Sequence, residues 1–172
     1  MKKTGIAFGW KTNKDAYTIA VAIALVLASV LLVTYYVWLR PVSEGYTTIY
    51  LLDSNRTAAD YPEFAVANVN STFHVYVDVE NHLNDTLNNV QVQVKVVSDQ
   101  NPSFPLDVNA TQTFTGTVQK DGTWETPVTF SLNQPGNYLV AFELWIPNGN
   151  MGNLEFSGNF CALNVQIAAG TA

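Results

Sequence analysis

The chain has 172 residues, a formal net charge of −6 and 48% hydrophobic residues. Acidic side chains outnumber basic ones by 14 to 8, and because such a surface repels a phosphate backbone, nucleic acid is not expected as a partner. The single cysteine, Cys161, excludes an intrachain disulfide, so a packed core has to hold the fold. We expect a buried thiol that acts as a small hydrophobe, and an intermolecular disulfide is the alternative.

The charges are distributed unevenly along the chain. Residues 1–40 carry five Lys or Arg and one Asp, about +4 (5 − 1), whereas residues 41–172 carry three basic and thirteen acidic residues, about −10 (3 − 13). Residues 1–15 are too short to fold alone and form a basic lead. Because flanks rich in Lys and Arg stay on the cytoplasmic side, the N-terminus is predicted to be cytoplasmic and residues 41–172 extracytoplasmic.

Residues 16–40 are predicted to form a transmembrane helix, which makes the lipid bilayer the first expected partner. No charged residue occurs in 16–39, and this stretch is long enough to cross a hydrocarbon core of about 30 Å with some tilt. Aromatic rings that favour the headgroup zone lie at its two ends, namely Tyr17, Tyr35, Tyr36 and Trp38. Pro41 is expected to end the helix. A cleaved secretory signal is the alternative, but its apolar core would run about 7–15 residues.

Small residues recur every four positions within this stretch. They are Ala16, Ala20, Ala24 and Ala28. This spacing places them on one side of a helix, where small side chains allow a second helix to approach closely in lipid. The pattern predicts a helix-packing face, although alanine is common in membrane spans and chance spacing is the alternative.

Residues 41–172 are predicted to form one β-sheet domain, because apolar and polar residues alternate with turn signals between the runs. About seven strands are expected, at residues 45–52, 72–80, 87–97, 110–118, 123–132, 138–146 and 160–167. Residues 53–68 are irregular and are not assigned a strand. The run 110–118 is expected at a sheet edge, and 138–146, which is apolar on both faces except at Glu143, is expected to be central. In 87–97, the face carrying Lys95 is expected to be wet.

Short strands at this spacing are typical of two packed sheets. The predicted fold is therefore an all-β, immunoglobulin-like antiparallel β-sandwich of about seven strands, tethered by one N-terminal transmembrane α-helix. The cysteine–tryptophan–cysteine signature of antibody domains is absent from the sequence.

Four N-glycosylation sequons occur after the apolar stretch, in predicted loops or at strand ends. They begin at Asn55, Asn70, Asn84 and Asn109. A chain rich in Asn and Thr produces some of these motifs by chance, but their position agrees with the topology inferred from charge. The sequence thus predicts an extracytoplasmic glycoprotein with these four candidate acceptors for N-glycans.

Ionisable residues do not form a recognisable reactive site in the sequence. Asp78, Glu80 and His82 share one face of a predicted strand and could in principle bind a metal, but an exposed polar face is the preferred interpretation. No zinc-binding spacing occurs, and no nucleophile motif with a base is found. We expect no catalytic residue, no metal site and no cofactor, and therefore no enzyme.

Several segments together resemble a known family. They are Tyr50-Leu51-Leu52, Ala58-Ala59-Asp60-Tyr61-Pro62, Glu80-Asn81-His82, Trp124-Glu125-Thr126-Pro127-Val128-Thr129-Phe130 and Pro135-Gly136. Over about residues 46–167 the chain resembles the extracytoplasmic domain of a family of archaeal membrane proteins, the domain of unknown function sixteen-sixteen. The resemblance implies an immunoglobulin-like outer domain behind membrane helices and an archaeal source, with no established activity. Members often have several helices, so any role of the additional helices does not transfer.

These observations leave two classes of function. The first is a non-catalytic accessory or structural subunit of an archaeal membrane complex, in contact with other membrane-protein subunits through the helix and the sandwich. The second is a free-standing, glycosylated cell-surface module that binds envelope proteins or glycans. The first is preferred because of the alanine face and the doubly apolar strand.

Overall fold

The computed structural model describes residues 13–39, 45–98, 101–148 and 152–170. It divides into two compact units, Met1–Ser43 and Glu44–Ala172. Most of the predicted basic lead and the predicted helix stop at Pro41 lie outside the described residues.

The described residues of the first unit form a helix, in agreement with the prediction. Helix α1 spans Asn13–Thr34 and continues as a π-helical turn, η1, over Tyr35–Leu39. Its segment Ala16–Trp38 has a mean hydropathy of 2.6 and is long and apolar enough to cross a membrane. The hydroxyls of Ser29 and Thr34 donate to carbonyls one turn back, at 2.8 and 2.8 Å, so the helix satisfies these two polar groups internally.

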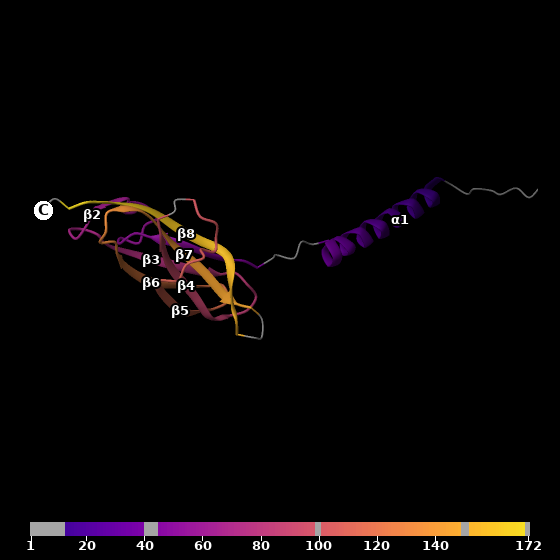
Figure 1. The fold of residues 1–172 in the computed structure, drawn as a ribbon. Helices are drawn as coiled ribbons and strands as arrows, with labels where there is room; N and C mark the ends of the chain where they lie inside the picture. The colour runs from indigo at the N-terminus through magenta and orange to yellow at the C-terminus, as the bar shows by residue number, and fades with distance from the viewer. Residues whose placement is uncertain (1–12, 40–44, 99–100, 149–151, 171–172) are drawn as a thin grey trace, which may run out of the picture. The chain divides into compact units, whose positions relative to one another are not determined.

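The described residues of the second unit form two sheets (Figure 1). The strands are β1 (Thr47–Leu52), β2 (Phe64–Val66), β3 (Thr72–Asn81), β4 (Leu87–Val97), β5 (Gln112–Val118), β6 (Gly122–Ser131), β7 (Gly136–Pro147) and β8 (Leu154–Ala168). One sheet has the order β1-β3-β6 and the other β2-β8-β7-β4-β5. The pairs are antiparallel except for β2, which lies parallel to β8.

The core forms between the two sheets from the alternate residues that the sequence places inward. In β3 the inward residues Val75, Val77 and Val79 are at most 1% exposed, and they belong to one cluster with Val92 of β4 and Phe142 of β7. Burial of these side chains from both sheets supplies the main stabilisation of the fold. The predicted immunoglobulin-like β-sandwich is confirmed.

The strands differ most from the prediction at two places. Strand β2 has three residues, too few to show a period, and it lies in the stretch that was not assigned a strand. Strand β8 begins at Leu154, six residues before the predicted 160. The edge position of β5 and the central position of β7 agree with the prediction.

Side chains from outside the sheet cap the free edge of β1. The amide of Asn159 donates to the carbonyl of Thr47 at 2.9 Å, and the thiol of Cys161 donates to the carbonyl of Ile49 at 3.2 Å. The Tyr61 hydroxyl donates to the carbonyl of Leu51 at 2.6 Å. Three alternate carbonyls of this edge strand are thus satisfied, which closes one side of the sandwich and blocks the addition of another strand there.

A buried side chain links the two sheets at the end of β3. This residue is Asn81, the last residue of that strand. Its buried amide nitrogen donates to the carbonyls of Asp85 (2.8 Å), Val118 (3.1 Å) and Gln119 (3.2 Å). Its amide oxygen accepts the backbone N–H of Leu83 at 2.9 Å. One side chain therefore ties the end of β3 to the end of β5, which belongs to the other sheet.

Candidate functional site

The helical unit places the four predicted packing residues on one face. Ala16, Ala20, Ala24 and Ala28 all lie in α1 and are exposed in this chain. Their spacing brings each residue nearly one turn above the last, so that their small side chains form a continuous row. Such a row of small side chains would allow a second helix to approach closely. That a partner helix packs there stays a prediction.

The four candidate glycosylation residues are exposed in the second unit: Asn55, Asn70, Asn84 and Asn109. Two of them also have structural roles. The Asn55 amide nitrogen donates to Asp53 at 3.3 Å, and the Asn70 amide oxygen accepts the Val66 N–H at 2.7 Å. Their occupancy stays a prediction, which the exposure of the side chains supports.

Two residues of the predicted polar face, Glu80 and His82, belong to one hydrogen-bonded network, which does not include Oδ1 of Asp78. Glu80 accepts the Tyr50 hydroxyl, and its other carboxylate oxygen lies 3.1 Å from Nε2 of His82. Hydrogen bonds from Tyr50 and then His82 hold the pKa of Glu80 below its ordinary value, while burial, followed by the bond to Glu80, raises the pKa of Tyr50 to about 12. Burial and then the nearby Glu125 raise the pKa of Asp78. Among the described residues, no group of three or more His, Cys, Asp or Glu could hold a metal ion.

Acidification is expected to weaken the domain through Glu80. A carboxyl whose pKa is lower in the folded state contributes stability above its unfolded pKa, about 4.3, and the contribution is lost as the pH falls through the folded pKa. The midpoint temperature of thermal unfolding should therefore decrease as the pH is lowered below about 5, and it should decrease less in Glu80→Gln. Asp53, whose pKa is lowered by the backbone N–H of Thr57, should keep part of the dependence in that variant. Equal slopes in the two proteins would contradict this role for Glu80.

Cys161 is half-buried rather than fully buried, and its thiol is a hydrogen-bond donor as well as a packing group. Burial raises its pKa to about 11. The thiol is therefore protonated at neutral pH and unreactive as a nucleophile. The expected packing role is consistent with this environment, and the intermolecular disulfide stays untested.

The outer face of the five-stranded sheet contains a buried ion pair, which corrects the prediction that Lys95 lies on a wet face. The Lys95 ammonium lies 2.9 Å from Oε2 of Glu143, and the two side chains are 5% and 0% exposed. Lys95 also donates to the carbonyl of Leu106 at 2.8 Å, and Oε1 of Glu143 accepts the Leu106 N–H at 2.6 Å. The loop before β5 thus covers this face, so the pair is removed from water.

Two sequence signals point to this pair in retrospect. Glu143 is the lone acid in a strand that is apolar on both faces, and a buried carboxylate needs a partner. Lys95 is the only Lys or Arg within the strands β1 to β8. The loop that covers the pair is irregular and contains a cis peptide bond between Phe104 and Pro105. The alternation of residues within β4 could not show that a loop covers Lys95.

A cleft of about 590 Å³ opens beside the pair, and we call it the Trp145 cleft. It lies between the loop and the outer face of β4 and β7, and its lining comprises Gln93, Lys95, Pro105, Leu106, Asp107, Val108, Asn109 and Trp145. The indole N–H of Trp145 donates to Oε2 of Glu143 at 3.1 Å, and the Lys95 ammonium lies 5.3 Å from the centre of the Trp145 ring. The cleft therefore combines an oriented aromatic ring with amide and carboxylate groups.

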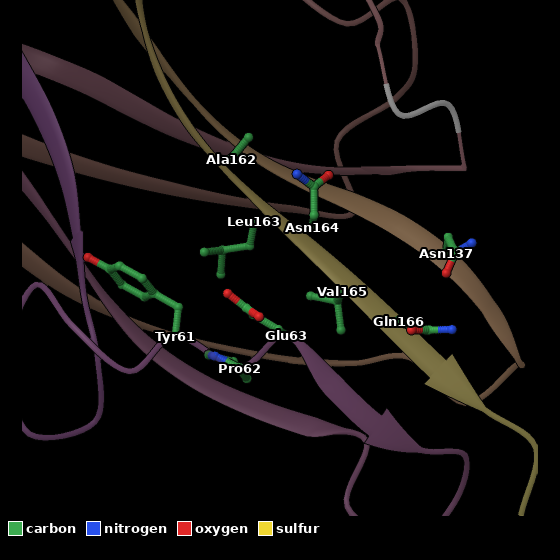
Figure 2. A pocket seen from close by; sticks show the side chains of 9 residues that line it. All are labelled: Tyr61, Pro62, Glu63, Asn137, Ala162, Leu163, Asn164, Val165 and Gln166. Carbon is green, nitrogen blue, oxygen red and sulfur yellow. The ribbon is translucent and has the colours of Figure 1, made fainter.

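A second cleft, of about 520 Å³, lies where β2 separates from β8 (Figure 2). Gln166 donates its backbone N–H to the carbonyl of Glu63 at 2.8 Å, but the preceding Pro62 has no N–H with which to extend this pairing. Figure 2 shows Ala162 and Asn164 on one side of β8 and Leu163 on the other, with the Glu63 side chain on the side of Leu163. This cleft is lined by amide groups, one carboxylate and Tyr61, whose hydroxyl donates to the carbonyl of Leu51 in β1.

The chain is similar to several solved structures at low sequence identity. The CARDB domain of the PF1109 protein from Pyrococcus furiosus is 12% identical with a TM-score of 0.49, over 73% of this chain and 97% of that chain. The PapD-like domain 7 of human CEP192 is 12% identical with a TM-score of 0.39, over 77% of this chain and 93% of that chain. A search of curated proteins found no match.

One family matches the chain over residues 41–147. The match ends at the last residue of β7, so β8 lies beyond it, whereas the resemblance in the sequence extends to residue 167. Because the matched residues are more than half of the chain, the chain belongs to the family described as domain of unknown function DUF1616.

Proposed function

We propose that the chain is a non-catalytic, single-pass membrane protein that serves as an accessory subunit of an archaeal membrane complex. In this proposal α1 crosses the cell membrane with the N-terminus in the cytoplasm. The sandwich lies on the extracytoplasmic side and carries N-glycans. The helix and the sandwich both contact other membrane-protein subunits.

The observation that carries this proposal is the combination of a helix that has a long uncharged, apolar segment with a domain that has its own core. Ala16–Trp38 is long enough to cross a membrane, and Glu44–Ala172 forms a separate compact unit. The orientation is supported by the charge of about +4 before residue 41 and about −10 after it. The subunit role is supported by the row of four alanines on α1, because small residues favour helix association in lipid.

The topology is tested with a protease added to intact cells. The sandwich is expected to be cleaved or released, since it faces outward, while a tag at the N-terminus is protected until the membrane is permeabilised. A protected sandwich together with an accessible N-terminus would overturn the orientation.

The subunit role is tested by enlarging the alanine row. The double variant Ala20→Leu/Ala24→Leu is expected to lose co-purifying membrane proteins after gentle detergent extraction, because the larger side chains separate the helices. The matched control is Ala22→Leu/Val26→Leu, which adds bulk on another face of α1. Equal recovery of partners in both variants would remove the alanine row from the proposal.

The second candidate is a free-standing cell-surface module. It is favoured by the exposure of all four sequon asparagines, because glycans at Asn55, Asn70, Asn84 and Asn109 would obstruct a tight protein interface. A species of monomer size without co-purifying proteins, measured by native sizing, would support this candidate and contradict the subunit role.

A further inference from the structure

We propose that the Trp145 cleft binds a neutral pyranose sugar. The lining has the chemistry that such a ligand requires: an indole ring for the apolar C–H face of the sugar, and amide and carboxylate groups for its hydroxyls. The volume of about 590 Å³ lies within the range of small-molecule sites.

The aromatic ring is held in place before any ligand arrives. Trp145 donates its indole N–H to Glu143, and the ammonium of Lys95 packs on the ring. Glu143 and Lys95 also bond the backbone of Leu106, which holds the loop wall against the sheet. The buried ion pair therefore orients both the Trp145 ring and the loop that forms the wall of the cleft. Little conformational entropy would be lost in ordering these groups when a ligand binds.

The polar groups favour an uncharged ligand. Gln93 and Asn109 contribute side-chain amides, and Asp107 contributes an exposed carboxylate. The ammonium of Lys95 is already bonded to Glu143 and to a carbonyl, so it is not free for an anion. A phosphate or an acidic sugar would meet Asp107 without a free cation among the lining residues, and like charges repel. A neutral hexose or N-acetylhexosamine fits this charge pattern.

The sugar can come from two sources. Asn109 lines the cleft and is also the first residue of a sequon, so a glycan attached there would begin at the rim of the cleft. A free oligosaccharide of the cell envelope would enter from solvent. An attached glycan, and an encounter with an envelope sugar in the cell, both require the outward orientation proposed above. Binding of a free sugar in solution can be measured without that orientation.

The free source is tested by calorimetry with the full chain, made in a host that does not glycosylate and held in nanodiscs. The probes are cellohexaose, mannohexaose and chitohexaose, with hexagalacturonate as the acidic comparison. At least one neutral probe is expected to bind, and Trp145→Ala and Asp107→Ala should each lower its affinity at least about tenfold. Trp145→Phe should retain most of the affinity because it keeps an aromatic face. Phe64→Ala, which removes an aromatic side chain that is 59% exposed outside the cleft, should have no effect.

The attached source is tested with chain from a glycosylating host, by comparing unfolding midpoints before and after enzymatic removal of the glycan. Loss of the glycan should lower the midpoint in the parent chain, and should change it less in Trp145→Ala and in Asn109→Gln. A result in either arm supports the site. Absence of both effects, or binding that survives Trp145→Ala and Asp107→Ala, would overturn the proposal. The protease test of orientation has a separate readout, so the two failures are distinguishable.

Discussion

Replacing Glu143 by leucine is expected to destabilise the sandwich by about 3–5 kcal/mol, because it leaves the ammonium of Lys95 buried without its counter-charge. The backbone N–H of Leu106 and the indole N–H of Trp145 lose their acceptor as well. Unfolding by urea, followed through tryptophan fluorescence of the full chain in detergent, measures the change in the free energy of unfolding.

A double-mutant cycle separates the loss of the ion pair from the loss of packing. Lys95→Met/Glu143→Leu removes both charges while keeping apolar side chains of similar size, and replacement of a whole buried pair is often close to neutral. The double variant should therefore be more stable than Glu143→Leu alone, with a coupling energy of about 2 kcal/mol or more. Additive effects of the two substitutions would show that the charges do not interact in the folded chain.

Replacing Asn81 by aspartate is expected to cost on the order of 3 kcal/mol or more, although the two side chains have nearly the same shape. The amide nitrogen that donates to Asp85, Val118 and Gln119 becomes an oxygen that faces the same carbonyls. Asn81→Ala should cost less than Asn81→Asp, because it leaves unsatisfied carbonyls without adding a buried charge. The same unfolding measurement checks the order.

The matched control for Asn81 is Asn88→Asp, at an exposed position of β4 close in sequence. This change should stay within about 0.5 kcal/mol of the parent chain, since exposed substitutions seldom have larger effects. If Asn81→Asp were equally mild, the link between the ends of β3 and β5 would contribute little to the fold.

The inward faces of the long strands could be predicted because burial follows a period of two. Val75, Val77 and Val79 occupy every second position of β3. The residues that the sequence pattern predicts to face inward are the ones that are buried in the core. The short strand β2 escaped prediction because three residues show no period, and its partner on β8 is about a hundred positions away in sequence. Local propensity carries no information on such a pairing.

The candidate site could not be predicted in the same way, because a loop creates it. Lys95 stands at a position that the alternation in β4 assigns to the solvent face. Its burial results from Leu106, whose backbone forms hydrogen bonds with both members of the ion pair. Asn81 comes directly after the predicted strand 72–80, in a segment rich in Asn and Asp, and nothing local shows that its amide reaches β5. Glu143 was recognised as unusual, yet its partner depends on the register between β4 and β7.

The position of β8 beyond the matched residues has a practical consequence for work on the family. This strand pairs with β7 from Gly136 to Pro147, and it supplies the Asn159 and Cys161 side chains that cap β1. A fragment cut at residue 147 would leave β7, buried on both faces, as an unpaired and largely apolar edge. Such an edge recruits strands from other molecules, so the fragment would aggregate where the longer chain stays soluble in detergent. Preparations intended for biophysics should therefore extend through residue 168.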